Sequence, residues 1–262
     1  MKISVIIAFY KNFPFLDLIF AGLKRQNHTD FEVIVAEDDN AAETPAFIRD
    51  RSADLPFPIK HVNQLQDLGF RKNEILNKAI AASSGEFLVL LDGDCVPHRH
   101  LLKEYAELAR EGVALYGRRV MVSQRLTAKL LATGDLKLLS LYHHMRYGSK
   151  RIEDGIYLPF FRKRTVRGIW GCNWGIMKRH LIEVNGYDED YVSAGVGEDI
   201  DIEWRLIRKG VKLQSVKHRA IVYHLWHKAH YSLDQCEPNY AMLRAKQQQD
   251  HAYCLNGLDK YL

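Results

Sequence analysis

The chain has 262 residues, 47% of them hydrophobic, which is enough to fill the core of one large α/β domain or two small ones, and its net charge is +5. Four cysteines without a CxxC pair or regular spacing exclude a zinc knuckle and a disulfide framework, and no segment is long enough to span a bilayer. Because the apolar start of the chain is also too short for a signal-peptide core, we expect a cytoplasmic protein in a reducing compartment.

Strands and helices alternate over the first hundred residues. Apolar runs predict strands at 3–9, 31–36 and 87–91, with a shorter strand at 59–62. Apolar residues at helical spacing predict helices over 15–25 and 71–82. This alternation is typical of a doubly wound α/β half, and the unbroken apolar run at 87–91 indicates a parallel strand that is buried on both faces.

Acidic residues follow two of these predicted strands. Glu37, Asp38 and Asp39 come after the second strand, and Asp92 and Asp94 come after the run at 87–91. Open α/β sheets bind ligands at the carboxyl ends of their strands, and two carboxylates spaced i, i+2 on an extended chain project to the same side. Asp92 and Asp94 could therefore share a hard cation, or a cation and a ribose. An ordinary acidic turn that caps the next helix is the alternative.

The second half is less regular. We expect a helix over 100–110, a strand at 113–116, a Leu-rich basic stretch over 126–147, a helix that ends at 209–210, a strand at 216–223 and a polar helix over 239–255. Residues 118–167 contain twelve Lys and Arg but three acids, a local charge of +9. We expect this segment to contact the acceptor, or to bind peripherally to the inner face of an anionic membrane. A solvated basic surface without a partner is the alternative. No nucleic-acid-binding motif accompanies it, so nucleic acid is not an expected partner.

A third acidic cluster, Glu198, Asp199 and Asp201, starts the predicted helix that follows Gly195-Val196-Gly197. Acids in a first helical turn complement the helix dipole and need no catalytic role. The glycines, however, permit close packing against a ligand, and His224 arrives at the end of a later strand. An imidazole that joins an aspartate oxygen suits Mn²⁺, with Mg²⁺ as the other choice, although a lone histidine is more often a satisfied core or surface residue.

These motifs, in this order, resemble the inverting nucleotide-sugar glycosyltransferases of family 2, which have the GT-A fold. The resemblance covers the opening strand with Phe9 and Tyr10, the second strand with Glu37-Asp38, and Asp92-Gly93-Asp94. Downstream, Gly171-Cys172-Asn173-Trp174-Gly175 with Gly197-Glu198-Asp199 is similar to the galactosyl- and N-acetylgalactosaminyltransferase branch, including chondroitin-type polymerases. The implied fold is a mainly parallel, Rossmann-like sheet flanked by helices, with a mixed acceptor-side half.

The resemblance also implies roles for individual residues. Phe9, Tyr10, Arg71 and Asn73 would form the nucleotide pocket, with Asp38 on the base, uracil in a UDP-sugar. Asp92 would hold the ribose, and Asp94 would ligate the divalent cation together with His224, for which His227 is a substitute. Asp199 would be the catalytic base, Glu198 would bond a sugar hydroxyl, and Trp170, Asn173 and Trp174 would line the sugar site. Core burial is the alternative for at least one tryptophan.

Two departures leave points open. The family usually has two aspartates, a glycine and a serine where this chain has Glu37-Asp38-Asp39-Asn40, so either Asp38 or Asp39 could meet the base. The galactosyltransferase branch usually has a tryptophan where Val196 stands, so acceptor stacking would come from Trp170, Trp226 or Tyr191.

The resemblance implies a metal-dependent enzyme of polysaccharide biosynthesis that moves a sugar from a nucleotide-sugar to a glycan or glycolipid acceptor. A sugar-1-phosphate nucleotidyltransferase would need a glycine-rich loop after the first strand, where residues 8–14 have no glycine. A non-catalytic nucleotide- or carbohydrate-binding subunit is the remaining alternative. We divide the chain into a nucleotide-binding half (1–97), an acceptor- and metal-completing half (98–230) and a C-terminal helical tail (231–262).

Overall fold

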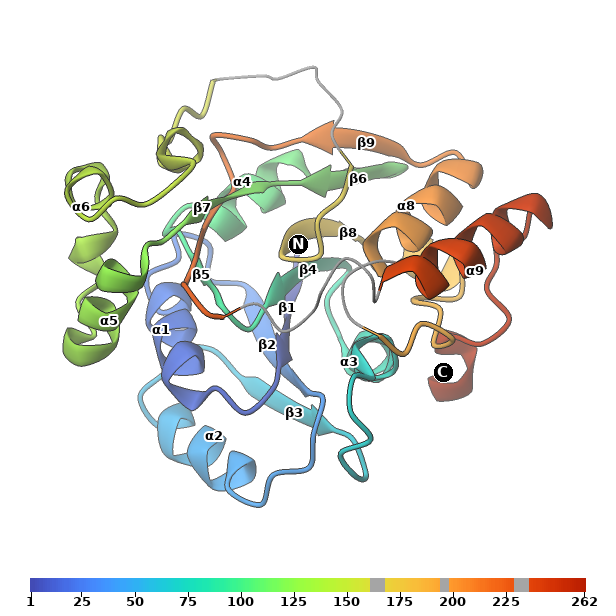
Figure 1. The fold of residues 1–262 in the computed structure, drawn as a ribbon, viewed down its shortest axis with the longest axis horizontal. Coiled ribbons are helices and arrows are strands. Elements are labelled where there is room, and N and C mark those ends of the chain that lie inside the picture. Colours follow the sequence, from blue (N-terminus) through green and yellow to red (C-terminus); the bar gives the residue numbers. More distant parts are fainter. Residues whose placement is uncertain (161–167, 194–197, 229–235) are drawn as a thin grey trace.

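A computed structural model describes residues 1–160, 168–193, 198–228 and 236–262 (Figure 1). Its centre is a seven-stranded sheet in the order β3-β2-β1-β4-β8-β6-β9. The strands are β1 (Ile3–Phe9), β2 (Phe31–Glu37), β3 (Ile59–Asn63), β4 (Phe87–Asp92), β6 (Val113–Tyr116), β8 (Asn173–Met177) and β9 (Lys212–Ser215). Strand β8 is antiparallel to both of its neighbours, while the other pairings in this sheet are parallel, which confirms the predicted mixed α/β fold.

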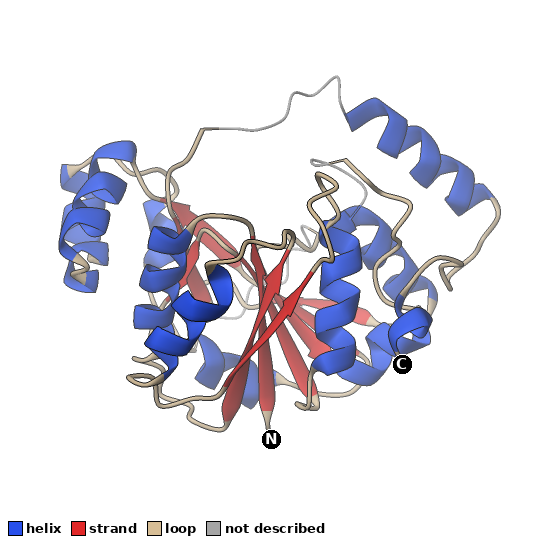
Figure 2. Cartoon of the chain, turned by 90° about the horizontal axis from the view of Figure 1, so that it is seen from below, coloured by secondary structure: helices blue, strands red, loops and turns tan. Residues whose placement is uncertain are grey.

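Helices cover both faces of this sheet (Figure 2). They are α1 (Phe13–Leu23), α2 (Thr44–Ser52), α3 (Lys72–Ala82), α4 (Leu101–Leu108), α7 (Lys178–Glu183) and α8 (Glu198–Arg208). Residues two apart on a strand face the same side. Val5 and Ile7 therefore belong to the hydrophobic cluster that includes α1 and α4, whereas Ile6 belongs to the cluster that includes α3 and α8. Burial on both faces explains why the inner strands are continuously apolar.

A second, three-stranded sheet lies beside the main one, in the order β5-β10-β7. Its strands are β5 (Cys95–Pro97), β7 (Arg118–Met121) and β10 (Ile221–His224). Two helices, α5 (Gln124–Thr133) and α6 (Leu141–Arg146), and two 3-10 turns, η1 (Leu136–Leu139) and η2 (Ile152–Gly155), extend from it at one end of the molecule (Figure 1). Most of the basic segment 118–167 forms this end, and residues 161–167 lie outside the described part.

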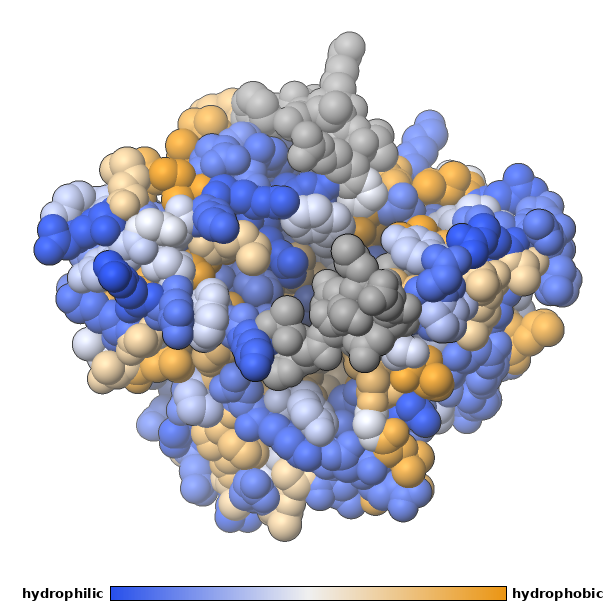
Figure 3. Space-filling model, in the orientation of Figure 1, coloured by the Kyte–Doolittle hydropathy of each residue, from blue (hydrophilic) through white to orange (hydrophobic). Residues whose placement is uncertain are grey.

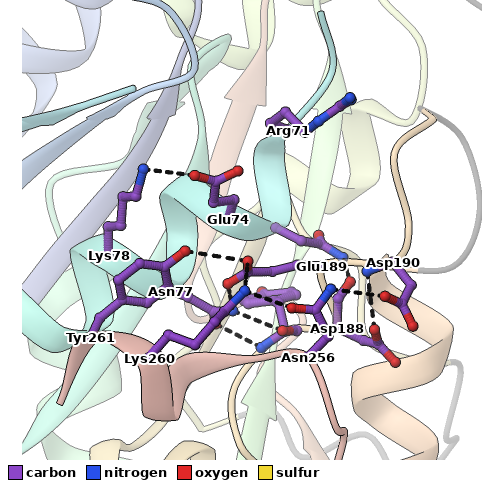
Figure 4. A network of polar contacts seen from close by, with 12 residues as sticks. Arg71, Glu74, Asn77, Lys78, Asp188, Glu189, Asp190, Asn256, Lys260 and Tyr261 are labelled. Carbon is purple, nitrogen blue, oxygen red and sulfur yellow. Dashed lines mark hydrogen bonds and ion pairs between the residues drawn. The ribbon is translucent and has the colours of Figure 1, made fainter. Parts of the chain in front are cut away.

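Hydrogen bonds and ion pairs to Glu189 connect the C-terminal segment to α3 (Figure 4). It contains α9 (Glu237–Gln248) and the 3-10 turn η4 (Leu258–Tyr261). Lys260 and the Tyr261 hydroxyl both contact Glu189, and Glu189 also accepts a hydrogen bond from Asn77 of α3 at 2.9 Å. Leu258 is fully buried in the cluster that includes α3, so this end of the chain is part of the packed domain.

The structure corrects two predicted elements. The strand predicted at 216–223 is shorter than expected. Residues 217–219 form a turn, and the strand β10 begins only at Ile221. The helix predicted over 239–255 is α9, which ends at Gln248. The helical spacing of polar residues did not indicate where it stops. Over the described residues, no helix is long and apolar enough to cross a membrane.

Candidate functional site

Two histidines converge on Asp94 at the edge of the sheet. Asp94 follows β4, His224 ends β10, and the backbone N–H of Leu225 donates to the Asp94 carbonyl at 2.8 Å, which joins the two segments. The Asp94 Oδ2 atom lies 3.0 Å from His227 Nε2 and 3.3 Å from His224 Nε2. One ligand atom from each residue can be chosen so that all lie within 4.8 Å of one another. Two imidazoles and a carboxylate in this arrangement could hold a divalent cation.

The charges at this cluster support one another. Burial alone would raise the pKa of the Asp94 carboxyl, but hydrogen bonds from His224 and His227 lower it well below its usual range. The Asp94 carboxylate raises the pKa of His227 in turn. Asp94 is therefore ionised at any physiological pH, as a metal ligand must be.

Gly93 lets the Asp92-Gly93-Asp94 loop pack against the end of β1. A Cβ atom at Gly93 would lie 2.5 Å from the carbonyl oxygen of Ala8, a contact that backbone atoms cannot yield to cheaply. The glycine thus fixes how far the two carboxylates project beyond the sheet.

Lys72 connects this loop to the start of α8. Its Nζ atom lies 2.9 Å from Asp92 Oδ1 and 2.8 Å from Glu198 Oε1. Burial alone would lower the pKa of Lys72, but the charges of Asp92, Glu198 and Asp199 raise it well above its usual value, so the lysine stays protonated. The second carboxylate oxygen of Glu198, Oε2, is buried and has no hydrogen-bond partner among the described residues. That oxygen is available to a hydroxyl group of a ligand.

Asp199 lies directly beside this bridge. Its Oδ2 atom accepts a hydrogen bond of 2.7 Å from the backbone N–H of Gly171. Burial, and then repulsion from Glu198, raise the pKa of Asp199 to about 7, although Lys72 and the Gly171 N–H oppose the shift. A Cβ atom at Gly171 would lie 2.5 Å from Asp199 Oδ1, so only glycine permits this approach. A carboxyl group that is half ionised near neutral pH is well matched to accept a proton.

Cations surround Trp170, which precedes Gly171. The guanidinium carbons of Arg118, Arg151 and Arg119 lie 4.6, 5.1 and 5.5 Å from its ring centroid. The charge of Arg119 also acts on Asp92 and Asp94, and its Nε atom is buried without a hydrogen-bond partner in the described ranges. Trp170 is half-buried, so part of its ring remains open to a ligand.

The second acidic cluster, Asp38 and Asp39, lies at the same edge of the sheet, at the end of β2. The Asp38 carboxylate accepts hydrogen bonds from the Arg71 backbone N–H at 2.9 Å and from Gln64 Nε2 at 3.3 Å, and burial raises its pKa. Asp39 Oδ2 lies 3.4 Å from Lys11 Nζ. Tyr10 is half exposed and donates from its hydroxyl to Asp67 at 3.1 Å. Both Asp38 and Asp39 are buried, so the choice between them as the partner of a base stays open.

Four side chains that the sequence placed in ligand pockets are buried instead: Phe9, Asn73, Asn173 and Trp174 are each at most 1% exposed. The Asn173 Oδ1 atom accepts a hydrogen bond of 2.7 Å from Tyr105, and its Nδ2 atom donates to the carbonyls of Arg118 and Ala220, so this residue connects strands. Trp174 packs in the hydrophobic cluster that includes α3. We therefore correct both expectations: Asn173 and Trp174 point to opposite faces of β8, and both are core residues because both faces of this strand are covered.

The same correction applies to the Phe9 ring, which packs beside Phe13 under the sheet, with ring centroids 5.3 Å apart. Asn73 donates a hydrogen bond of 2.6 Å to the Asp188 carbonyl. Among the other predicted residues, Tyr10, Arg71 and Trp170 keep exposed or half-buried side chains.

Sequence reasoning missed Lys72 and Arg119 and treated His227 only as a substitute for His224. Lys72 starts α3 and pairs with a residue 126 positions away, a contact that no local pattern reveals. The spacing of His224 and His227, which places one at the end of β10 and the other three residues later, was the available signal for a joint site. Gly195, Val196 and Gly197 lie outside the described residues.

Comparison with known proteins identifies relatives of the chain. Residues 4–184 match the profile of the family described as glycosyl transferase family 2, and residues 157–228 match one described as the N-terminal domain of galactosyltransferase. An uncharacterized glycosyltransferase from Nostoc sp. is 32% identical over 111 residues, which are 41% of this chain and 33% of the relative. The chain thus spans about a third of the length of this curated relative.

Solved structures show the same fold. Residues 1–349 of S. aureus TarS in complex with UDP align with a TM-score of 0.65 and 16% identity, covering 100% of this chain and 68% of that one. The mannosyltransferase PcManGT from Pyrobaculum calidifontis, in complex with GDP-Man and Mn²⁺, aligns with a TM-score of 0.57 and 18% identity, covering 95% and 62%. At sequence identities this low, the similarity shows only a common fold.

Proposed function

Because the chain belongs to glycosyltransferase family 2 and has the GT-A fold, we propose that it moves a hexose from a UDP-sugar to a hydroxyl group of a glycan or glycolipid, with inversion at the anomeric carbon and with a divalent cation. One observation carries this proposal. Lys72 bridges Asp92 and Glu198, which joins the loop of the Asp94 cluster to the segment of Asp199. A cation-binding group and a group able to accept a proton therefore share one site.

The donor binds along the carboxyl ends of β1, β2 and β4. Tyr10 and Arg71 flank the base, and Asp38 or Asp39 accepts hydrogen bonds from it. Asp92 accepts from the ribose. Arg119, whose charge acts on Asp92 and Asp94, faces the diphosphate. We keep residues 1–97 as the nucleotide-binding half, 98–230 as the acceptor- and metal-completing half, and 231–262 as the tail.

Asp94, His224 and His227 would hold the cation, since an ionised carboxylate and two imidazoles are a fitting donor set for it. Nitrogen ligands favour Mn²⁺ over Mg²⁺, which prefers oxygen. When bound, the cation supplies positive charge that stabilises the departing diphosphate. GDP-Man and Mn²⁺ in PcManGT support a divalent cation here.

Asp199 acts as the base in a single displacement. The acceptor oxygen forms a bond to the anomeric carbon as the bond from that carbon to the diphosphate oxygen breaks, and the electron pair leaves with the diphosphate. Asp199 takes the hydroxyl proton, and its raised pKa of about 7 makes it a stronger base than an ordinary aspartate. Glu198 Oε2 accepts a hydrogen bond from a sugar hydroxyl, and Trp170 packs on the sugar.

Galactose or N-acetylgalactosamine is proposed as the transferred sugar only on the resemblance of residues 171–175 and 197–199 to that branch, because the domain matched by residues 157–228 identifies a glycosyltransferase domain and not a donor. The UDP and UDP-GlcNAc complexes of TarS support a uridine donor. The basic segment 118–167 serves an acidic acceptor or the surface of an anionic membrane, in keeping with polysaccharide biosynthesis in the cytoplasm.

A donor screen tests the function. UDP-galactose, UDP-glucose and their N-acetyl forms, together with GDP-mannose, are incubated with the protein and Mn²⁺, and release of the nucleoside diphosphate is measured. We expect Mn²⁺-dependent release from one uridine donor, abolished in Asp94→Ala but retained in Asp50→Asn, an exposed acid of α2. Release from GDP-mannose alone, or release without any divalent cation, would contradict the proposal.

A further inference from the structure

A cavity lies away from Asp94, between the small sheet and the end of the molecule formed by η1 and α6. Its volume is about 350 Å³, and its lining includes Arg25, His98, Arg99, Lys137, His144 and Tyr223. Successive residues of a strand point to opposite faces. Because His224 contacts Asp94, its neighbour Tyr223 faces the other side of β10, so the cavity and the catalytic cluster occupy opposite faces of the small sheet.

The cavity has a cationic rim. Arg25 follows α1, Arg99 follows β5 and Lys137 lies in η1, so three separate segments each contribute one positive charge. Within the described part of the chain, the lining contains no carboxylate. The charge of Arg25 acts on the His98 and Tyr223 side chains in the interior. A cavity with several cations and no acid is complementary to an anion.

His144 places a buried polar ring in the lining of the cavity. The residue is 2% exposed, and its ring stacks on Tyr223 with centroids 5.3 Å apart. Its Nδ1 atom lies 3.0 Å from the Ser149 hydroxyl, which already accepts a hydrogen bond from the backbone N–H of Ser123. In the tautomer in which this hydroxyl donates to Nδ1, the neutral imidazole carries its proton on Nε2.

The Nε2 atom of His144 is buried, and among the described residues it has no well-oriented hydrogen bond, although the backbone carbonyl of Leu139 acts on the ring as an acceptor. Burial lowers the pKa of both His144 and His98 to about 4, so both rings are neutral near pH 7. A phosphate oxygen in the cavity would give Nε2–H a better-oriented acceptor than the Leu139 carbonyl does.

We propose that this cavity binds a phosphate group, with Arg25, Arg99 and Lys137 neutralising its charge and His144 Nε2 donating a hydrogen bond to one oxygen. The surrounding surface fits a phosphate that carries an organic group. On α6, the side chains of Leu141, Tyr142 and Met145 are 43%, 60% and 58% exposed, and Leu141 also lines the cavity. Figure 3 shows apolar and hydrophilic residues interspersed over this end of the molecule. The phosphate could come from an anionic phospholipid or from a soluble phosphate ester.

Phosphate titration of the full chain in metal-free buffer tests the proposal. The ring nitrogens of ¹⁵N-labelled histidine are followed by NMR while inorganic phosphate is added, and the His144 signal is expected to shift saturably. The double variant Arg25→Gln/Lys137→Gln should weaken binding at least tenfold. The control Arg49→Gln/Lys209→Gln removes the same charge at exposed positions on α2 and after α8 and should bind like the parent.

Co-sedimentation with vesicles of phosphatidylglycerol or phosphatidylcholine distinguishes the two sources. A preference for phosphatidylglycerol that the Arg25/Lys137 variant loses identifies a lipid headgroup, with or without detectable binding of free phosphate. Saturable phosphate binding without that preference identifies a soluble phosphate ester. The proposal is overturned if neither probe binds, or if the two double variants bind both probes equally.

Discussion

The proposed donor side and the proposed acceptor side of the site position their side chains by different means. Asp38 follows β2 and Asp92 ends β4, the two parallel strands on either side of β1, and the register of these strands brings both carboxylates to one sheet edge. Asp199 and His224 come instead from α8 and β10, and contacts with Gly171 and Asp94 hold them in place. The sheet register thus positions the carboxylates of the proposed donor side, whereas a few individual contacts position those of the proposed acceptor side. We therefore expect the acceptor side to be more sensitive to single substitutions.

Among substitutions outside the proposed base and metal ligands, Gly171→Ala should have the largest effect on catalysis. The new Cβ atom would meet Asp199 Oδ1 at 2.5 Å and displace the base, while the donor-side strands stay unchanged. We expect the transfer rate to fall about 100-fold or more, the range that a displaced general base costs. Steady-state transfer and UDP calorimetry on the same sample separate the two sides. A variant that loses UDP affinity as strongly as transfer would contradict the division.

His227→Asn should weaken Mn²⁺ binding about 10- to 100-fold, as losses of metal-site partners typically do. The reason is that His227 Nε2 lies as close to Asp94 as His224 Nε2 does. Titrating Mn²⁺ into the transfer assay gives the apparent affinity, with His28→Asn as the control in the donor half. Equal Mn²⁺ affinities in the His227 variant and the control would leave His224 as the sole histidine ligand.

The pH dependence of transfer should report Asp199. The base must be ionised, and its pKa is about 7, so kcat should rise about tenfold per pH unit below pH 7 and level off above it. Saturating Mn²⁺ and donor keep protonation of His227 from limiting the rate. A profile that is flat between pH 5 and 8 would mean that another group accepts the proton.

Asp199→Asn should also stabilise the fold slightly at high pH. The folded pKa of about 7 exceeds the unfolded value of about 3.9, so the parent loses stability as pH rises between these values. The variant avoids this loss, which is at most about 4 kcal/mol at pH 8 because each of the roughly 3 pKa units is worth about 1.4 kcal/mol, or up to about 10 °C in Tm. Thermal unfolding at pH 8 and pH 4 checks it, since the difference should nearly vanish at pH 4. A lower Tm for the variant at pH 8 would contradict the account.

The sequence carried more information about the donor side than about the acceptor side. The apolar runs of β1, β2 and β4 are buried on both faces, so both the strands and the acids after them were evident. Asn173 and Trp174 were misplaced because a tryptophan beside glycines resembles a pocket wall, whereas the pairing of β8 with β4 and β6 buries it. The sequence did not predict a role for Lys72, because its partners Asp92 and Glu198 come together only in the folded chain.

One experiment addresses the central claim that Asp94 and Asp199 belong to a single site, in which Asp94 binds the cation and Asp199 accepts the proton. Calorimetry of UDP binding with and without Mn²⁺, beside the transfer assay, is carried out on Asp94→Ala and Asp199→Asn. The account predicts that Asp199→Asn binds UDP with Mn²⁺ like the parent but transfers no sugar, while Asp94→Ala loses the Mn²⁺-dependent gain in UDP affinity. Full transfer by Asp199→Asn, or unchanged Mn²⁺-dependent binding by Asp94→Ala, would contradict it.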